Sequence, residues 1–265
     1  MNTARLELKA LGGVMWIASI VIIVFVSLPS VYICVWSFKG TTTVGILGPA
    51  SYRWYDSVFH NIGWAYAALY SIVVATISSA LAVSAGLLYF YFSMWHRRYY
   101  QTIGYLTLIG PLFFPAIVYG LALRMTLNSH SCPEWLGLII GHTLLMLPVL
   151  FFLLESSNEF VQIEWIYSSA TMGASHWEII RNILAPLIKR PLLTAFGIGM
   201  LMSFDEIVIA SAVIDSAHVT VPKKMWDVVN RDMDPTPAVI ATLLLAVAFI
   251  ALVLSRAYQR LLRSN

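Results

Sequence analysis

YSSATMGASHWEIIRNILAP, residues 167–186, is a mostly polar stretch of about twenty residues that lies between two long apolar stretches. Nine residues separate Gly173 from Ile183, and Pro186 follows shortly after. Local chemistry alone predicts an amphipathic connecting helix, in which Gly173 ends one segment and Pro186 breaks the next. The apolar stretches on both sides indicate that this segment is a loop at the surface of a membrane.

The composition excludes an ordinary soluble protein. The 265 residues are 59% hydrophobic and 11% charged, whereas a soluble domain has about a quarter of its residues charged. No soluble fold of this length could bury so much apolar surface, so membrane lipid is the expected surrounding. The formal net charge of +3 does not indicate a nucleic-acid partner, because the cations form small groups beside apolar segments. Cys34 and Cys132 lie far apart and predict neither a metal site nor a disulfide.

Six apolar stretches are long enough to cross about 30 Å of hydrocarbon as helices. They cover about 14–36, 65–95, 102–127, 135–154, 192–214 and 238–258. They are too long and too continuously apolar for the strands of a barrel. The first is also too long for a signal-peptide core, so it is interpreted as a retained helix. We expect an all-α, polytopic membrane protein with six transmembrane helices, kinked at Pro111, Pro115 and Pro148.

The distribution of cations predicts that both termini are cytoplasmic. In that orientation the inner segments hold Arg5, Lys9, Arg97, Arg98, Arg181, Lys189, Arg190, Arg256, Arg260 and Arg263, and the outer loops hold Lys39, Arg53, Lys223, Lys224 and Arg231. The short inner loop at 96–98 and the basic C-terminal segment are the clearest evidence for this orientation. Residues 167–186 then face the cytoplasm.

Polar residues inside the fifth apolar stretch are candidates for a transport pathway. Ser203, Asp205 and Glu206 lie there, and a carboxylate facing lipid costs a few kcal/mol or more. Both carboxylates should therefore face the bundle interior or water, and they favour a cationic substrate. The alternative is an interhelical hydrogen bond or an ion pair with Arg124, and the two interpretations are compatible. For His142 in the fourth stretch, a hydrogen bond to a neighbouring helix is favoured over a substrate role.

No arrangement of catalytic residues is present in the sequence. It contains no Gly-rich loop with Lys-Ser or Lys-Thr for ATP, no Ser-x-Gly elbow and no His-Glu-x-x-His. The chain is therefore not expected to be an enzyme, and no catalytic residue is assigned.

The spacing in residues 167–186 resembles the cytoplasmic loop of ABC-importer permeases, in which Glu-Ala-Ala, three residues, Gly and nine residues precede Ile-x-Leu-Pro. Gly173, Ile183 and Pro186 match this pattern, whereas 167–169 and 185 depart from it. The resemblance implies a short helix that docks on an ATP-hydrolysing subunit. The implied coupling residues are Gly173, Ala174, Ser175, Ile183 and Pro186. Tyr167 stands where the family carries an acidic residue, which puts that contact in doubt.

From residue 128 onward the chain resembles the second permease subunit of spermidine/putrescine-type importers. The segments that carry this resemblance are LGLIIGHTLLMLPV at 136–149, SFDEIVIASAV at 203–213 and VPKKMWDVVNRDMDPTPAVIATLLL at 221–245. It implies a type I ABC importer permease fold in a bacterial inner membrane. The permease core would cover 65–258, after an N-terminal helix and outer loop at 1–64 and before a cytoplasmic tail at 259–265.

The resemblance also implies partners and a substrate class. The partners are a second permease subunit, an ATPase dimer that holds ATP and Mg, and an extracytoplasmic solute-binding protein; this chain itself needs no cofactor. Residues 221–237 resemble a short amphipathic helix at the outer surface, where Lys223, Lys224 and Trp226 would meet the binding protein. The solute would be a polyamine, an opine or a related amine. The alternatives are an ion-coupled secondary transporter that uses Asp205, and a purely structural membrane subunit.

Overall fold

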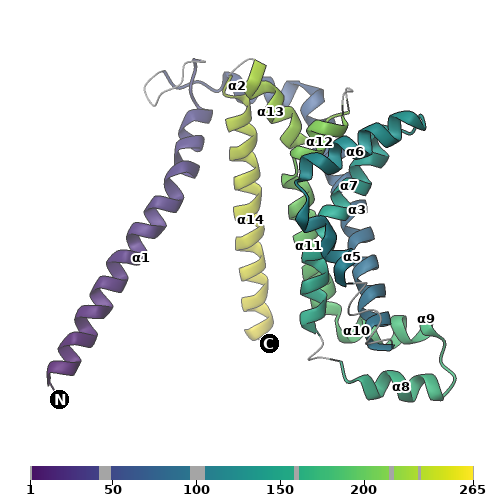
Figure 1. The fold of residues 1–265 in the computed structure, drawn as a ribbon. Coiled ribbons are helices and arrows are strands. Elements are labelled where there is room, and N and C mark those ends of the chain that lie inside the picture. The colour runs from purple at the N-terminus through teal and green to yellow at the C-terminus, as the bar shows by residue number, and fades with distance from the viewer. Residues whose placement is uncertain are drawn as a thin grey trace. The chain divides into compact units, whose positions relative to one another are not determined.

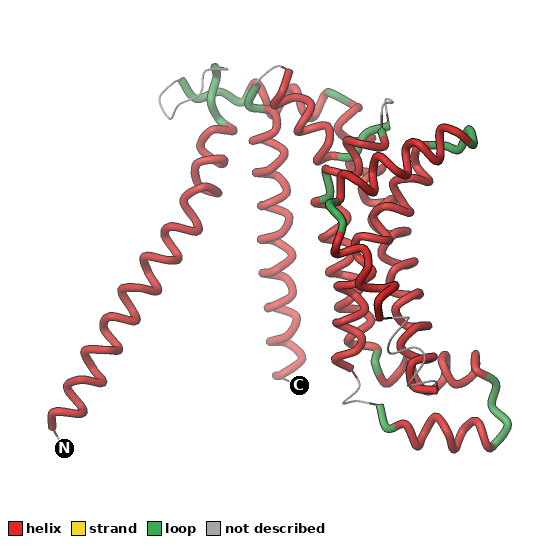
Figure 2. The backbone as a smooth tube through the Cα atoms, in the orientation of Figure 1, coloured by secondary structure: helices red, strands yellow, loops and turns green. Residues whose placement is uncertain are grey.

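The computed structural model describes residues 2–41, 49–95, 105–157, 161–214, 218–231 and 234–264. Within these residues every regular element is a helix, and the only extended pairing is an isolated bridge between Lys39 and Ala50 (Figures 1 and 2). The all-α prediction is confirmed. The chain forms two compact units, Met1–Ile62 with Met225–Asn265, and Gly63–Lys224. The predicted division at 64/65 and 258/259 rests on sequence resemblance and stays a prediction.

The first unit contains α1 (Asn2–Ser37), α2 (Arg53–His60) and α14 (Thr236–Ser264). Both α1 and α14 contain membrane-length apolar segments, Gly12–Ser37 and Thr236–Ala257, which confirms the first and sixth predicted spans. α14 contacts both α1 and α2. The most apolar 18-residue window of α1 has no buried residues, as expected for a helix surrounded by lipid or by another membrane subunit.

The core of the second unit is formed by α3 (Ile62–Trp95), α7 (Glu134–Glu155) and α11 (Lys189–Asp205). α3 and α7 confirm the second and fourth predicted spans, and α7 continues through Pro148. One buried cluster joins the three helices through Ala82, Met146, Leu150, Leu154 and Ala195. Small residues at such contacts let membrane helices approach closely and gain van der Waals packing.

The third predicted span is not a continuous helix. Its described part consists of α5 (Tyr105–Ile109), the 3₁₀ turn η2 (Gly110–Phe113) and α6 (Ala116–Ser129). Phe114 is extended, with φ −111° and ψ 138°, because it precedes Pro115. The two prolines of this stretch therefore break the helix, where the sequence predicted only kinks. The loop at 96–98, on which the orientation partly rests, lies outside the described residues.

The fifth predicted span is also broken. α11 ends at Asp205, Glu206 has an extended backbone, and α12 (Val208–Val213) begins two residues later. α12 packs against α6 and α7, and a Cβ atom added to Gly120 would lie 2.5 Å from the Ala212 Cβ. Among the described residues, four helices are long and apolar enough to cross a membrane, and α11 passes that test only together with His176–Leu187, from which it is bent by 83°.

Candidate functional site

The polar loop that contains residues 167–186 connects α7 to α11 through a series of short helices. These are α8 (Ile163–Thr171), α9 (His176–Ile179), the π-helical turn η4 (Ile180–Leu184) and α10 (Ala185–Leu187). Figure 1 shows α8 and α9 running across the direction of α11 at one end of the unit. The predicted connecting helix is therefore two helical segments with a turn between them.

Gly173 forms the turn between α8 and α9. Its φ angle is +91°, in the region where a Cβ atom is strained and glycine is not. The Gly173 N–H donates to the Ala170 carbonyl at 3.0 Å, so the chain reverses within a few residues. A Cβ atom placed on Gly173 would meet no atom within 4 Å. The expected tight bend is confirmed, and contact with an ATPase stays a prediction.

Ser175 begins α9 through a capping box with Glu178. The Glu178 N–H donates to the Ser175 Oγ at 3.3 Å, and the Ser175 N–H donates to the Glu178 Oε2 at 2.8 Å. These reciprocal bonds satisfy N–H groups that a helix start otherwise leaves free. The bonds from Ser175 lower the pKa of the fully exposed Glu178 carboxyl below its usual value. Ser175 therefore fixes where the helix after Gly173 starts.

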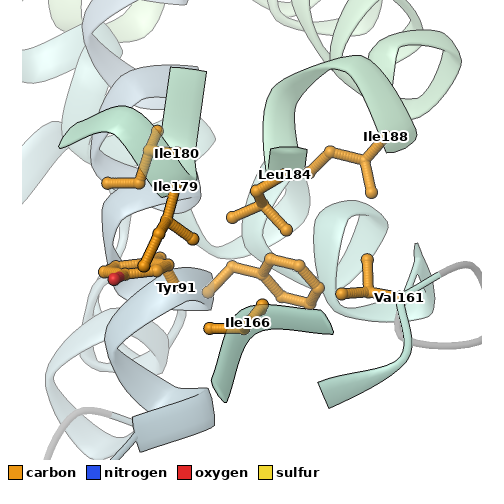
Figure 3. Packing of buried hydrophobic residues seen from close by; sticks show 8 residues of the cluster. Tyr91, Val161, Ile166, Ile179, Ile180, Leu184 and Ile188 are labelled. Atoms are coloured by element: carbon orange, nitrogen blue, oxygen red, sulfur yellow. The ribbon is translucent and has the colours of Figure 1, made fainter. Parts of the chain in front are cut away.

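A buried apolar cluster holds this loop against the Trp95 end of α3. Its members share very low exposure and come from α3, α8, η4 and the residues around them: Phe90, Tyr91, Val161, Ile166, Ile179, Ile180, Leu184 and Ile188. Figure 3 shows Ile179 and Ile180 close to the ring of Tyr91, and Ile166, Leu184 and Val161 gathered around a second aromatic ring of the cluster. Burial of this many large side chains makes the position of the loop depend on α3.

Aromatic contacts between α3 and the loop also fix the orientation of the loop. The Trp95 ring lies edge-on to Tyr167, with ring centroids 5.1 Å apart, and edge-on to His176 at 5.5 Å. The Tyr91 hydroxyl is 2.7 Å from the His176 Nδ1. Tyr167, which replaces the usual acidic residue, is thus a packing residue in this chain. Sequence patterns did not point to Tyr91 and Trp95, because aromatic residues near the end of a span are normally interfacial anchors. His176 belongs to no motif that would have indicated its contact with them.

The outward face of the loop carries large apolar side chains. Met172 is 87% exposed and Trp177 is 64% exposed. Of the predicted coupling residues, Pro186 is exposed, Ile183 is half-buried, and Ala174 packs partly against the buried cluster. Exposed apolar residues beside an ordered turn are typical of a protein interface. The spacing motif did not point to Met172 or Trp177.

The π-helical turn η4 lies directly before Pro186. The Ala185 N–H donates to the carbonyl of Ile180, five residues earlier. Pro186 has no N–H and cannot continue an α-helical bond pattern, and the chain then bends after Ile188, where φ is −99° and ψ is 23°. Pro186 thus contributes to the expected break, but the bend falls two residues beyond it.

The predicted pathway carboxylates occupy the break between α11 and α12. Asp205 is exposed, and its carboxylate has no hydrogen-bond or ion-pair partner among the described residues. Glu206 is half-buried, and its Oε1 accepts a hydrogen bond of 2.7 Å from the Ile209 N–H at the start of α12. Arg124 donates to the Ala212 carbonyl at 3.3 Å. The two adjacent carboxylates therefore have different environments, and Glu206 has a structural contact that Asp205 lacks.

Ser203, the third predicted pathway residue, is buried. Its Oγ lies 2.7 Å from the His142 Nδ1 and so links α11 to α7. The prediction that His142 bonds a neighbouring helix is confirmed. Because this bond occupies the Ser203 hydroxyl, Ser203 has a helix-packing contact, and its pathway role stays a prediction.

The predicted docking residues lie on one helix, α13 (Val221–Arg231), which confirms the expected short helix. Its start is fixed to α3 by a hydrogen bond of 2.8 Å from the Val221 N–H to the Ser71 Oγ. Lys224 places its Nζ 4.6 Å from the centroid of the Trp64 ring. Trp226 is 53% exposed, and Lys223 is half-buried.

Comparison with known proteins agrees with this geometry. The family described as binding-protein-dependent transport system inner membrane component matches residues 78–264. The chain is 23% identical over 214 residues to the spermidine/putrescine transport system permease protein PotC of Haemophilus influenzae, which covers 79% of this chain and 82% of that protein. It is 22% identical over 239 residues to the putrescine transport system permease protein PotI of Escherichia coli K12, which covers 86% and 85%.

A solved structure shows the same fold. A chain of a bacterial ABC transporter involved in the import of the acidic polysaccharide alginate superposes with a TM-score of 0.70, over 95% of this chain and 96% of that chain, at 14% identity. The family match covers most of the sequence, and the fold agrees with it. The chain therefore belongs to the family of binding-protein-dependent transport system inner membrane components, and it is the non-catalytic inner-membrane permease subunit of such an importer.

Proposed function

We propose that this chain, together with a second permease subunit, forms the path by which an ATP-driven importer carries a small cationic or zwitterionic solute across the inner membrane. Both termini and the loop from α8 to α10 face the cytoplasm in this proposal. An ATPase dimer, which holds ATP and Mg, docks on that loop, and a solute-binding protein docks on the opposite side at α13. The polyamine permeases among its relatives support an amine as the solute.

The loop geometry carries the proposal. The exposed residues Met172 and Trp177 flank the Gly173 turn, and their own helices are fixed to α3 by a buried cluster. A force applied to an exposed face reaches the membrane helices only if the parts between are packed tightly. That combination suits a surface that receives motion from an ATPase and passes it to α3.

An exposed carboxylate supports a solute that carries an ammonium group. Asp205 is exposed at the α11–α12 break and has no partner in the described residues. A permease must bind its solute weakly enough to release it, and one exposed carboxylate suits transient contact with an ammonium group. Beside it, Ser203 holds the end of α11 to α7 through His142, and Glu206 bonds the start of α12.

The docking surface for the binding protein is proposed from α13. Lys223, Lys224 and Trp226 give this short helix two cations and an exposed aromatic side chain. Charges at such a surface mainly set the rate of encounter. A Lys223→Glu variant should therefore slow activation by the loaded binding protein, and high salt should remove the difference. Unchanged activation rates at low salt would contradict this docking surface.

Gly173 offers the sharpest test of the function as a whole. Gly173→Ala adds only backbone strain of about 1–2 kcal/mol, whereas Gly173→Trp adds the same strain and an indole ring at a position where a Cβ atom meets nothing within 4 Å. In proteoliposomes with the co-purified partner subunits, Gly173→Trp should lower ATP-driven amine uptake at least tenfold further than Gly173→Ala does. The complex should still assemble.

Gly197→Trp is the control for added bulk, because a Cβ atom on Gly197 also meets nothing within 4 Å and this residue lies within α11, outside the loop. It should keep most of the uptake. Equal uptake by the two Gly173 variants would show that no ATPase contacts this turn. Uptake that persists without ATP but needs an ion gradient would favour the secondary transporter.

A further inference from the structure

The Gly63 end of α3 carries a pair of hollows, of whose lining residues the proposed function uses only Lys224, as a docking residue on α13. One has a volume of about 430 Å³ and is lined by residues that include Tyr66, Tyr70, His218 and Lys224. The other has a volume of about 320 Å³ and is lined by Tyr70, Pro133, Glu134, Trp135 and His218. Tyr70 and His218 belong to both, so the two spaces adjoin; we call them the paired hollow.

The frame around the paired hollow is firmly packed. Val74, Leu138, Ala210 and Ile214 form a buried cluster from α3, α7 and α12, with Tyr70 and Val219 packed against it. The hydrogen bond from the Val221 N–H to the Ser71 Oγ holds the start of α13 to α3. The lining groups therefore have positions set by the fold, as a binding site requires.

The smaller hollow has the chemistry of an ammonium site. Trp135 is 50% exposed and lies beside Glu134 at the start of α7. The rings of Tyr70 and His218 are 6.2 Å apart between centroids and form the shared wall. Aromatic faces attract cations, and a carboxylate beside them adds a full opposite charge. No large aliphatic side chain lines this hollow.

The larger hollow is lined by a positively charged residue. Lys224 lines it, and the Lys224 Nζ lies over the Trp64 ring at 4.6 Å. Partial burial lowers the pKa of Lys224, because removal from water penalises the charged ammonium. An anionic group placed in this hollow would favour the charged form again, whereas a second ammonium group would oppose it.

We propose that the paired hollow binds one zwitterionic solute, with its ammonium group between Glu134 and Trp135 and its anionic group toward Lys224. This inference rests on the proposed function, in which the chain carries small amines, and it narrows the substrate class. Monoamines that carry a carboxylate fit this charge pattern better than polyamines do. A diamine of the same length would place its second ammonium group beside Lys224.

Three four-carbon probes separate these possibilities: 4-aminobutyrate is a zwitterion, putrescine is a dication, and 1,4-butanediol is neutral. The full chain, labelled with 5-fluorotryptophan, is placed in phosphatidylglycerol nanodiscs, and the Trp135 ¹⁹F resonance is assigned by its loss in Trp135→Phe. We expect 4-aminobutyrate to shift this resonance at a concentration at least tenfold lower than putrescine, and 1,4-butanediol to leave it unchanged.

Charge substitutions make the test specific. Lys224→Glu should reverse the order so that putrescine binds better, and Lys224→Gln, a milder change, should bring the two amines within about twofold. Glu134→Gln should weaken both amines at least tenfold. Glu155→Gln is the matched control, because Glu155 is also half-buried and lies at the other end of α7; it should change neither.

Several results would overturn the assignment. Putrescine binding as tightly as 4-aminobutyrate, or a preference unchanged in both Lys224 variants, would remove the role of Lys224. A Trp135 resonance already shifted in phosphatidylethanolamine discs and insensitive to 4-aminobutyrate would assign the hollow to a lipid headgroup. These measurements need no ATPase, so their failure with intact ATP-driven amine uptake rejects the paired hollow alone. Binding without any such uptake would reject the proposed function instead.

Discussion

The two ends of α3 differ in how deeply their polar and aromatic side chains are buried. At the Trp95 end, Tyr91 is fully buried in an apolar cluster, and its hydroxyl lies within hydrogen-bond distance of the exposed His176. At the Gly63 end, Tyr66 is 66% exposed beside hollows that also hold Glu134 and Lys224. A closed, densely packed contact transmits displacement, whereas an open one with mixed charge admits and releases a solute. The same helix thus contacts the coupling loop at its Trp95 end and lines the paired hollow at its Gly63 end.

Leucine truncation at each end should give the largest contrast. Leu184 is fully buried in the loop cluster, whereas Leu69 lines the paired hollow and is 60% exposed. Leu184→Ala should lower the free energy of unfolding by about 2–5 kcal/mol because it leaves a cavity. Leu69→Ala should change it by about 0.5 kcal/mol or less. Thermal unfolding in nanodiscs measures both, and equal losses would erase the distinction between the ends.

The Tyr91–His176 contact should give a smaller effect on stability and a clear one on coupling. Tyr91→Phe removes a hydrogen bond worth about 1 kcal/mol, and a double-mutant cycle with His176→Ala should recover about that energy. Uptake per ATP hydrolysed should fall in Tyr91→Phe while ATP hydrolysis continues.

Ser93→Ala serves as the control for that cycle, because the Ser93 Oγ bonds the Phe90 carbonyl within α3. It should leave the ratio of uptake to hydrolysis unchanged. An unchanged ratio in Tyr91→Phe as well would mean that the loop moves without help from this contact.

The neighbouring carboxylates at the α11–α12 break should separate structural from transport roles. Glu206→Gln weakens the bond to the Ile209 N–H and should cost about 1 kcal/mol of stability. Asp205→Asn should cost about 0.5 kcal/mol or less, since the Asp205 side chain is exposed, but it should lower amine uptake severalfold. Complex yield and uptake, measured for both variants, decide the matter. Full uptake by Asp205→Asn would remove it from the pathway.

The smallest expected effect is a local pH dependence at the start of α9, in the loop that packs on the Trp95 end of α3. The bonds from Ser175 hold the pKa of Glu178 below its usual 4.5, so the capping box is intact above pH 4.5 and weakens as pH falls through the lowered pKa. The Ser175 amide resonance should titrate with a midpoint below 4.5, and Ser175→Ala should move the Glu178 midpoint upward. Glu178→Gln should show no such titration. A midpoint at or above 4.5 in the native chain would show that Ser175 and Glu178 do not form the capping box.

Sequence reasoning found the long helices because length and apolar composition decide them. α1, α3, α7 and α14 each lie near their predicted ranges. It failed at 102–127 and 192–214, where composition is equally apolar but the backbone departs from a helix. Phe114 is extended because Pro115 follows it, and Glu206 is extended while its own side chain caps α12. Such breaks depend on single residues and their tertiary partners.

The candidate site was predictable only in part. The Gly173 turn followed from a motif, since few residue types adopt a positive φ. The contacts of Tyr91 and Trp95 with the loop join residues more than 70 positions apart, and no local pattern reports such a distance. His142 and Ser203 were each noticed separately, but their hydrogen bond appears only when α7 and α11 lie together.

The wide turn at Ile180–Leu184 takes up one extra residue in the loop. Its five-residue hydrogen-bond step, from the Ala185 N–H to the Ile180 carbonyl, places one more residue in the turn than an α-helix would. One residue added to an ordinary α-helix would rotate the side chains before it by about 100° relative to those after it, whereas the wider turn absorbs the extra residue locally. Deleting one residue inside the turn should therefore restore an ordinary helical turn and leave the direction of Trp177 nearly unchanged. The turn thus lets this loop be one residue longer without changing the direction in which the permease presents Trp177.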